Sequence, residues 1–110
     1  MAKITNNEAR SYVMRKENFD TVNETMFAKT IEDHKAHTYT VYSYGHHFPM
    51  YVYDYKTGEW YGNKDKFSRT TSKHQSIAKP HGVDTWFDTK MLNRISLVGL
   101  TGLVEQRLAA

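Results

Sequence analysis

The alternation of polar and apolar side chains in this chain of 110 residues has a period of two between residues 38 and 61. That period is the one expected of strands with one buried face. It predicts three strands, over 38–44, 50–55 and about 60–61, separated by turns that contain glycine. Because both connections are as short as hairpins, the strands are expected to form an antiparallel meander.

The residues before the strands, 1–36, predict a helical lead-in. Apolar side chains at helical spacing indicate one short helix over about 6–17 and a second over about 25–35. The residues 20–24 between them predict a loop. We therefore expect the sheet to begin at about residue 38.

Two more helices are expected after the strands. Ser72 and Gln75 have the spacing of a capping box, which predicts a helix from Ser72 to Lys79 that a proline and a glycine then end. Residues 84–108 have helical spacing in two pieces, because glycines weaken the second piece. The apolar excess at 97–108 leaves two interpretations open: a last core helix, or a dimer contact that remains after folding.

Together the predicted elements indicate an α+β fold, a three-stranded antiparallel β-meander packed by short helices and by a C-terminal helix. A chain of this length can bury one modest core, so residues 1–110 are expected to form a single domain. Within it, 1–36 is the helical lead-in, 38–79 holds the meander and the helix that follows, and 84–108 is the C-terminal helical segment.

Composition narrows the class of protein. The chain has no cysteine, which excludes a disulfide framework, a thiolate metal site and a cysteine nucleophile. Its first residues are too polar for a signal peptide, and no stretch approaches the roughly 18 apolar residues of a membrane span. We therefore expect a soluble protein without a membrane partner.

The formal net charge of +3 is concentrated in the middle of the chain. Residues 34–83 carry seven Lys and Arg against three Asp and Glu, whereas 1–33 carry five against six and 84–110 carry three against three. A local surplus of this kind is typical of a surface that binds phosphate, although the solvated face of an ordinary protein has the same pattern.

The hydroxyl-rich segment 68–75 lies at the predicted start of a helix. Helix N-termini offer unpaired N–H groups, and neighbouring cations and hydroxyls strengthen the binding of a phosphate or carboxylate. The alternative is that the hydroxyls only cap the helix. The candidate residues for binding an anion or a nucleic acid are Lys64, Lys66, Arg69, Thr70, Thr71, Ser72, Lys73 and His74.

Aromatic side chains on the predicted strands add a second kind of contact. Rings interleaved with Lys and Arg suit single-stranded nucleic acid, because bases stack on the rings while the cations pair with phosphates. The same rings also suit a protein partner, or the core beneath the helices. The candidate aromatic contacts are Tyr42, Tyr44, Tyr53 and Trp60.

No catalytic residue is predicted. A catalytic triad could combine Ser68 or Ser72 with His74 and Asp65, but no nucleophile elbow surrounds either serine, so the triad is not predicted. The predicted strands also lack paired carboxylates with the spacing of a general acid and base. The protein is therefore not expected to be an enzyme.

The histidines do not show a clear metal-binding spacing. His46 and His47 are adjacent, and neighbouring side chains on a strand point to opposite sides and chelate poorly. A zinc site that combines His74 with Asp54 or Asp65 is an alternative. No metal and no cofactor are predicted.

Several short motifs in this chain occur together in one known group of proteins. They are Val41–Gly45 (Val-Tyr-Ser-Tyr-Gly), Pro49, Trp60 and the run Ser68-x-Thr70-Thr71-Ser72-Lys73-His74-Gln75. In this set the chain resembles a widespread family of small phage proteins, over about residues 9–80. The resemblance implies a phage origin and a location in the cytoplasm of the host bacterium, and it implies no catalytic residue.

We expect a small, non-enzymatic phage accessory protein that binds nucleic acid through the basic segment 64–79 beside the aromatic sheet. The alternative is a modulator or inhibitor that binds a host protein or a bacterial-defence protein, in the manner of anti-CRISPR proteins. Homodimerisation through 97–108 is a further expectation. A basic face open to solvent favours the first function, and an apolar patch at 97–108 favours the second.

Overall fold

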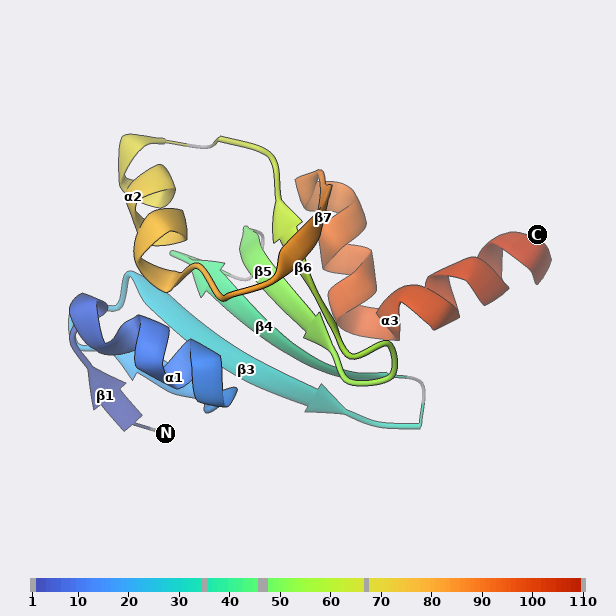
Figure 1. Cartoon of the computed structure of the whole chain (residues 1–110), viewed down its shortest axis with the longest axis horizontal. Helices are drawn as coiled ribbons and strands as arrows, with labels where there is room; N and C mark the ends of the chain where they lie inside the picture. Colours follow the sequence, from blue (N-terminus) through green and yellow to red (C-terminus); the bar gives the residue numbers. More distant parts are fainter. Residues whose placement is uncertain (1, 35, 46–47, 67, 110) are drawn as a thin grey trace.

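The structure of the protein is a computed structural model that describes residues 2–34, 36–45, 48–66 and 68–109. Across these residues the centre of the fold is a mixed seven-stranded sheet whose strands lie in chain order (Figure 1). The strands are β1 (Ala2–Ile4), β2 (Phe19–Thr21), β3 (Met26–Glu32), β4 (His37–Ser43), β5 (Pro49–Asp54), β6 (Glu59–Asn63) and β7 (Val83–Phe87). The helices are the 3-10 helix η1 (Asn6–Glu8), α1 (Ala9–Arg15), α2 (Arg69–Ala78) and α3 (Thr89–Ala109).

Both ends of the sheet are parallel pairs, and the middle is antiparallel. β1 runs parallel to β2 and β6 runs parallel to β7, whereas β2 to β6 are antiparallel neighbours. A parallel pair needs a crossover connection. η1 and α1 provide it between β1 and β2, and α2 provides it between β6 and β7. The chain therefore places a strand–helix–strand unit at each edge of a long meander.

The two faces of the sheet carry different helices. On one face, α1 and α2 contribute to the larger core, which includes Tyr51. On the other face, Leu92 and Ile95 of α3 pack with Val52 in a second core. Since Tyr51 and Val52 are neighbours on β5, the period of two along this strand directs alternate side chains into the two cores.

α3 is interrupted at Gly99, whose φ of 75° and ψ of 163° are not helical. The break is held by Asp54, whose fully buried side chain lies at the end of β5. The Asp54 Oδ2 accepts a hydrogen bond from Leu100 N at 2.9 Å, and Oδ1 accepts one from Lys56 N at 2.9 Å. A Cβ at residue 99 would lie 3.3 Å from Oδ2 on a backbone with positive φ, so this position favours glycine. Beyond the break the helix points away from the sheet (Figure 1).

The prediction of a three-stranded sheet is wrong, because the sheet has seven strands. β4, β5 and β6 lie where strands were expected, but β1, β2 and β3 lie in the predicted helical lead-in. In β3 the residues Phe27, Ala28 and Ile31 fit one helical face, whereas the burial of Met26 and Ala28 follows a period of two. Pairing with β4 along all seven residues of β3 decides between these two periods.

β7 also replaces part of a predicted helix. Trp86 and Phe87 were expected on an apolar helical face, but the segment Val83–Phe87 pairs in parallel with β6. This pairing depends on the α2 crossover, so no hairpin-length connection indicates it in the sequence. The helix of this region starts at Thr89, and its interruption at Gly99 agrees with the prediction of two helical pieces.

α2 begins earlier than predicted. Ser68 is its N-cap, and the Ser68 Oγ accepts a hydrogen bond from Thr71 N at 3.1 Å. Ser72 therefore lies within the helix and Gln75 is buried, so these two residues do not form a capping box. The helix ends at Ala78, ahead of the proline that was expected to end it.

Replacement of Asp54 by alanine should destabilise the protein by about 2–4 kcal/mol, because two backbone N–H groups lose their acceptor. Asp54→Asn is the matched control, since its carbonyl oxygen can keep one of the two bonds, and it should lose about half as much. Urea titration measures the free energy of unfolding of both variants. A loss below about 0.5 kcal/mol in Asp54→Ala would show that the carboxylate does not hold the break.

Candidate nucleic-acid interface

The basic segment of the chain lies in the crossover from β6 to β7. β6 leads into α2 on one face of the sheet, whereas β7 leads into α3 on the other face. The chain thus leaves the carboxyl ends of two neighbouring parallel strands in opposite directions. In open α/β sheets, ligands bind at such a divergence. The crossover is therefore the part of this fold best placed to hold a ligand.

Hydrogen bonds of polar residues connect the carboxyl ends of these two strands. The Asp65 carboxylate accepts hydrogen bonds from Thr89 N at 2.9 Å and from Thr89 Oγ1 at 2.8 Å. These bonds, the backbone one first, hold the pKa of Asp65 below its usual value. The Asn63 Nδ2 donates to the same Thr89 Oγ1 at 3.0 Å. The end of β6 and the start of α3 are thereby held in one position.

The inner face of α2 is polar and buried. The Ser43 Oγ of β4 lies 3.3 Å from Thr71 Oγ1 and 2.9 Å from His74 Nδ1. The Gln75 Nε2 donates to Asn63 O at 3.1 Å. Thr71 and His74, two of the predicted anion contacts, are therefore part of the attachment of α2 to the sheet, and their burial keeps them from the surface.

His74 lies beside Tyr44, with 5.5 Å between the two ring centroids. Burial lowers the pKa of His74 below its ordinary value of 6.5, and the positive charge of Lys73 adds to this effect. The imidazole is therefore neutral at pH 7, in keeping with its hydrogen bond to the neutral Ser43 hydroxyl.

The outer face of α2 and the loop before it are exposed and basic. We use the name basic face for five exposed cations: Lys64, Lys66, Arg69, Lys73 and Lys79. None of them forms a salt bridge with a carboxylate whose position the structure describes. Of the residues predicted to bind an anion, those that reach the surface are Lys64, Lys66, Arg69, Thr70, Ser72 and Lys73. The structure thus leaves all five predicted cations exposed within the crossover between β6 and β7.

The predicted aromatic contacts are mostly placed elsewhere. Trp60 is buried in the larger core, and Tyr42 is buried on the opposite face, beside α3. Tyr53 is half-buried, and the ammonium group of Lys16 lies 4.3 Å from its ring centroid. Tyr44 is 53% exposed and lies next to α2. Of these four rings, Tyr44 is the one that is open beside the basic face.

Trp86 is an aromatic residue of this surface that was not among the predicted contacts. It lies on β7 and is 39% exposed, and the Lys79 Nζ lies 5.7 Å from its ring centroid. A pocket of about 140 Å³ lies between this ring and α2. Its lining residues are Tyr51, Lys66, Ser72, Gln75, Ser76, Lys79 and Trp86. The sequence signal for Trp86 was the set of β-branched and aromatic residues Val83, Thr85, Trp86 and Phe87, which is typical of a strand.

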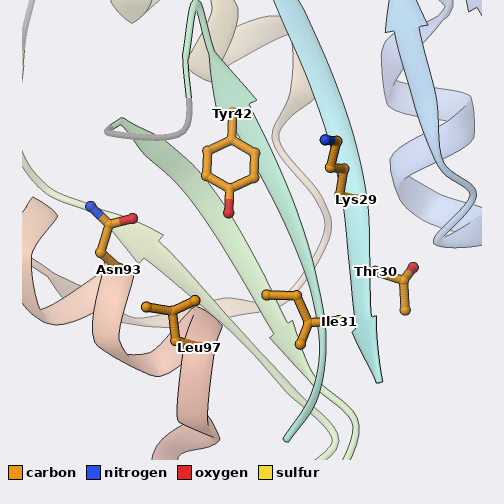
Figure 2. A pocket seen from close by; sticks show the side chains of 6 residues that line it. All are labelled: Lys29, Thr30, Ile31, Tyr42, Asn93 and Leu97. Carbon is orange, nitrogen blue, oxygen red and sulfur yellow. The ribbon is translucent and has the colours of Figure 1, made fainter. Parts of the chain in front are cut away.

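A second pocket, of about 350 Å³, lies on the opposite face of the sheet, beside α3 (Figure 2). Its lining residues are Lys29, Thr30, Ile31, Tyr42, Asn93 and Leu97. Figure 2 shows side chains of β3 on one side, side chains of α3 on the other, and Tyr42 between them. Leu97 is 61% exposed. An exposed leucine in a pocket wall suits contact with another protein better than contact with phosphate.

The groups considered for catalysis and for zinc are held by other contacts. Ser68, His74 and Asp65 each hydrogen-bond to a residue outside this trio. Within the described residues, no group of three His, Asp or Glu side chains is placed to hold a metal ion. His46 and His47 lie outside the described residues.

Neither protein-family models, nor curated proteins, nor solved structures gave a match to this chain. The resemblance to small phage proteins therefore stays a prediction from its motifs. Among the helices that the structure describes, none has both the length and the apolar character that crossing a membrane requires.

The lowered pKa of His74 predicts a loss of stability as the pH falls below about 6.5. In that range the imidazole of the unfolded chain takes up a proton while that of the folded protein resists protonation, so acid favours the unfolded state. His74→Gln should therefore show a weaker pH dependence of the free energy of unfolding between about pH 5 and 7. His81→Gln, at an exposed position, is the control and should match the wild type. Equal pH dependence in His74→Gln and the wild type would contradict the assignment.

Proposed function

We propose that the protein binds nucleic acid through the basic face. The observation that supports this most is the presence of five exposed cations on one crossover, none of them in a salt bridge with a described carboxylate. Such a surface attracts phosphates, and its binding releases the counterions condensed on the nucleic acid. The affinity is therefore expected to fall steeply as salt is added.

The contacts on this surface are of the kind that hold a strand without reading its sequence. Arg69 and Lys73 lie one turn apart on α2, so their side chains can pair with neighbouring phosphates. The exposed Thr70 hydroxyl adds a neutral donor between them. We expect DNA or RNA of any sequence to bind.

The motifs in the sequence support a more specific proposal. Because Val41–Gly45 and Ser68–Gln75 resemble the shared core of small phage proteins, we propose a phage accessory protein that acts in the cytoplasm of its host. An accessory protein that acts by binding alone needs no catalytic residue, and the proposal assigns none.

Simultaneous replacement of Arg69 and Lys73 by alanine should weaken binding of short DNA and RNA strands at low salt. Each lost phosphate contact should also reduce the slope of log affinity against log salt by about one. The melting temperature should change little, since both side chains are exposed. Fluorescence anisotropy titrations at two salt concentrations measure the affinity and its slope.

Lys29→Ala with Arg94→Ala is the matched control, because it removes one Lys and one Arg that are exposed away from the basic face, on β3 and α3. This control should keep the binding of the wild type apart from a small loss through net charge. Equal losses in the two double variants would mean that the effect comes from net charge and not from the basic face. Absence of binding to any strand at low salt would overturn the proposed function.

Binding of a host or bacterial-defence protein is a second candidate function, and the pocket beside α3 favours it. Leu97 is 61% exposed there, at the start of the apolar segment 97–108. A partner protein, or a second copy of this chain, would cover this leucine. Light scattering tests the second copy directly: a dimer that becomes a monomer in Leu97→Asp would support it, and a monomeric wild type would exclude it.

A further inference from the structure

Trp86 is partly exposed, although its ring packs closely against the sheet. It pairs with Gly62 across the parallel strands β7 and β6. A Cβ on Gly62 would lie 2.5 Å from a ring carbon of Trp86, so the absence of a side chain there lets the indole lie directly against β6. The ring of Tyr51 meets it edge-on, with 6.2 Å between centroids. The indole is thus held from below and from one side, and 39% of the residue stays exposed.

The pocket above this indole has polar and basic walls. Ser72 and Ser76 line it from α2, one turn apart, and Lys79 follows at the end of the helix. Lys66 lines it from the loop after β6. Its volume of about 140 Å³ equals roughly five water molecules. That is room for one flat ring or one phosphate, but not for a base pair.

Gln75 provides a reason to expect a base and not a phosphate alone. Its side chain lines the pocket and is 4% exposed. Its Nε2 donates to Asn63 O, whereas its Oε1 has no hydrogen-bond partner in the described part of the chain. Buried acceptors are normally paired. This oxygen is covered in the unbound protein. An N–H group of a base that enters the pocket can pair with it once its cover shifts, whereas phosphate oxygens are acceptors and cannot.

The pocket adjoins the basic face along α2. Residues 72, 76 and 79 follow one another at helical spacing, and Arg69 and Lys73 lie on the neighbouring stripe of the same helix. A strand held by those two cations can therefore turn one base towards the indole. In a duplex both faces of a base are stacked and its pairing edge is used, so only an unpaired base can enter.

We propose that the pocket between α2 and β7 holds the base of one unpaired nucleotide of a bound strand. The base lies against Trp86 with an N–H group towards Gln75, and the phosphate of this nucleotide stays outside the pocket, on the basic face. The inference rests on the proposed function and adds to it a preference for single strands over duplexes.

The fluorescence of Trp86 tests this assignment in the full chain. The probes are a short oligothymidylate, an abasic oligodeoxynucleotide of the same length, and the oligothymidylate annealed to its complement. Oligothymidylate should quench the tryptophan emission, and the abasic probe should not. The quenching should disappear in Trp86→Phe, in which the buried Trp60 is the remaining tryptophan.

Affinity provides an independent readout. Trp86→Leu should weaken binding of oligothymidylate about tenfold or more while leaving the abasic probe unaffected, because only stacking is lost. Trp86→Phe should keep most of the affinity. Tyr55→Leu, which removes a similarly exposed ring just after β5, is the matched control and should bind like the wild type. Ser76→Met, an exposed position whose larger side chain would fill the pocket, replaces Trp86→Leu should that variant fail to fold.

The outcomes separate this inference from the proposed function. The nucleotide pocket would be overturned if oligothymidylate, the abasic probe and the duplex bound with equal affinity and without quenching, and if neither Trp86→Leu nor Ser76→Met changed the affinity. That outcome would leave nucleic-acid binding intact. No binding of any probe would overturn both. Base-dependent quenching together with a tenfold preference for the single strand would support the pocket.

Discussion

The position of α2 depends on buried hydrogen bonds between polar side chains, in addition to apolar contact. Ser43 meets both Thr71 and His74, while the side chain and backbone carbonyl of Gln75 reach β6 and β5. A helix shifted by one turn would lose all of these bonds together, and buried polar groups are costly when unpaired. The network therefore holds the helix in one place. From there the chain returns beside β6, and the edge of the sheet is parallel for that reason.

Helical periodicity divides the segment 68–79 between the interior and the solvent. The inward positions are Thr71, His74, Gln75 and Ala78, and the outward positions are Arg69, Thr70, Lys73 and Ser76. Ser68 caps the helix. The hydroxyl-rich segment can therefore both attach the helix to the sheet and bind a ligand, because the inward residues do the first and the outward residues do the second. The same turn-by-turn alternation that fixes the helix on the sheet also aligns its cations on the opposite side.

The antiparallel centre of the fold could be predicted from the sequence, whereas its parallel ends could not. The alternation in β4 and β5 is regular and lies next to short turns, but residues 25–35 satisfy a helical period as well as a strand period. β7 and Trp86 depend on a crossover that no local pattern encodes. The exposed cations were predictable because long charged side chains are rarely buried. The burial of Thr71 and His74 could not be predicted, because the side that each residue faces depends on how α2 docks on the sheet.

The order of the strands has a consequence for contacts between separate molecules. β3 and β4, with seven residues each, lie inside the sheet, and the outermost strands are β1 with three residues and β7 with five. An open edge can recruit a strand from another chain, and short edges do so poorly. Because the crossover units lie outermost, the long tyrosine-bearing strands have no free edge. A sequence with this many β-prone aromatic residues is in this way protected from edge-to-edge aggregation.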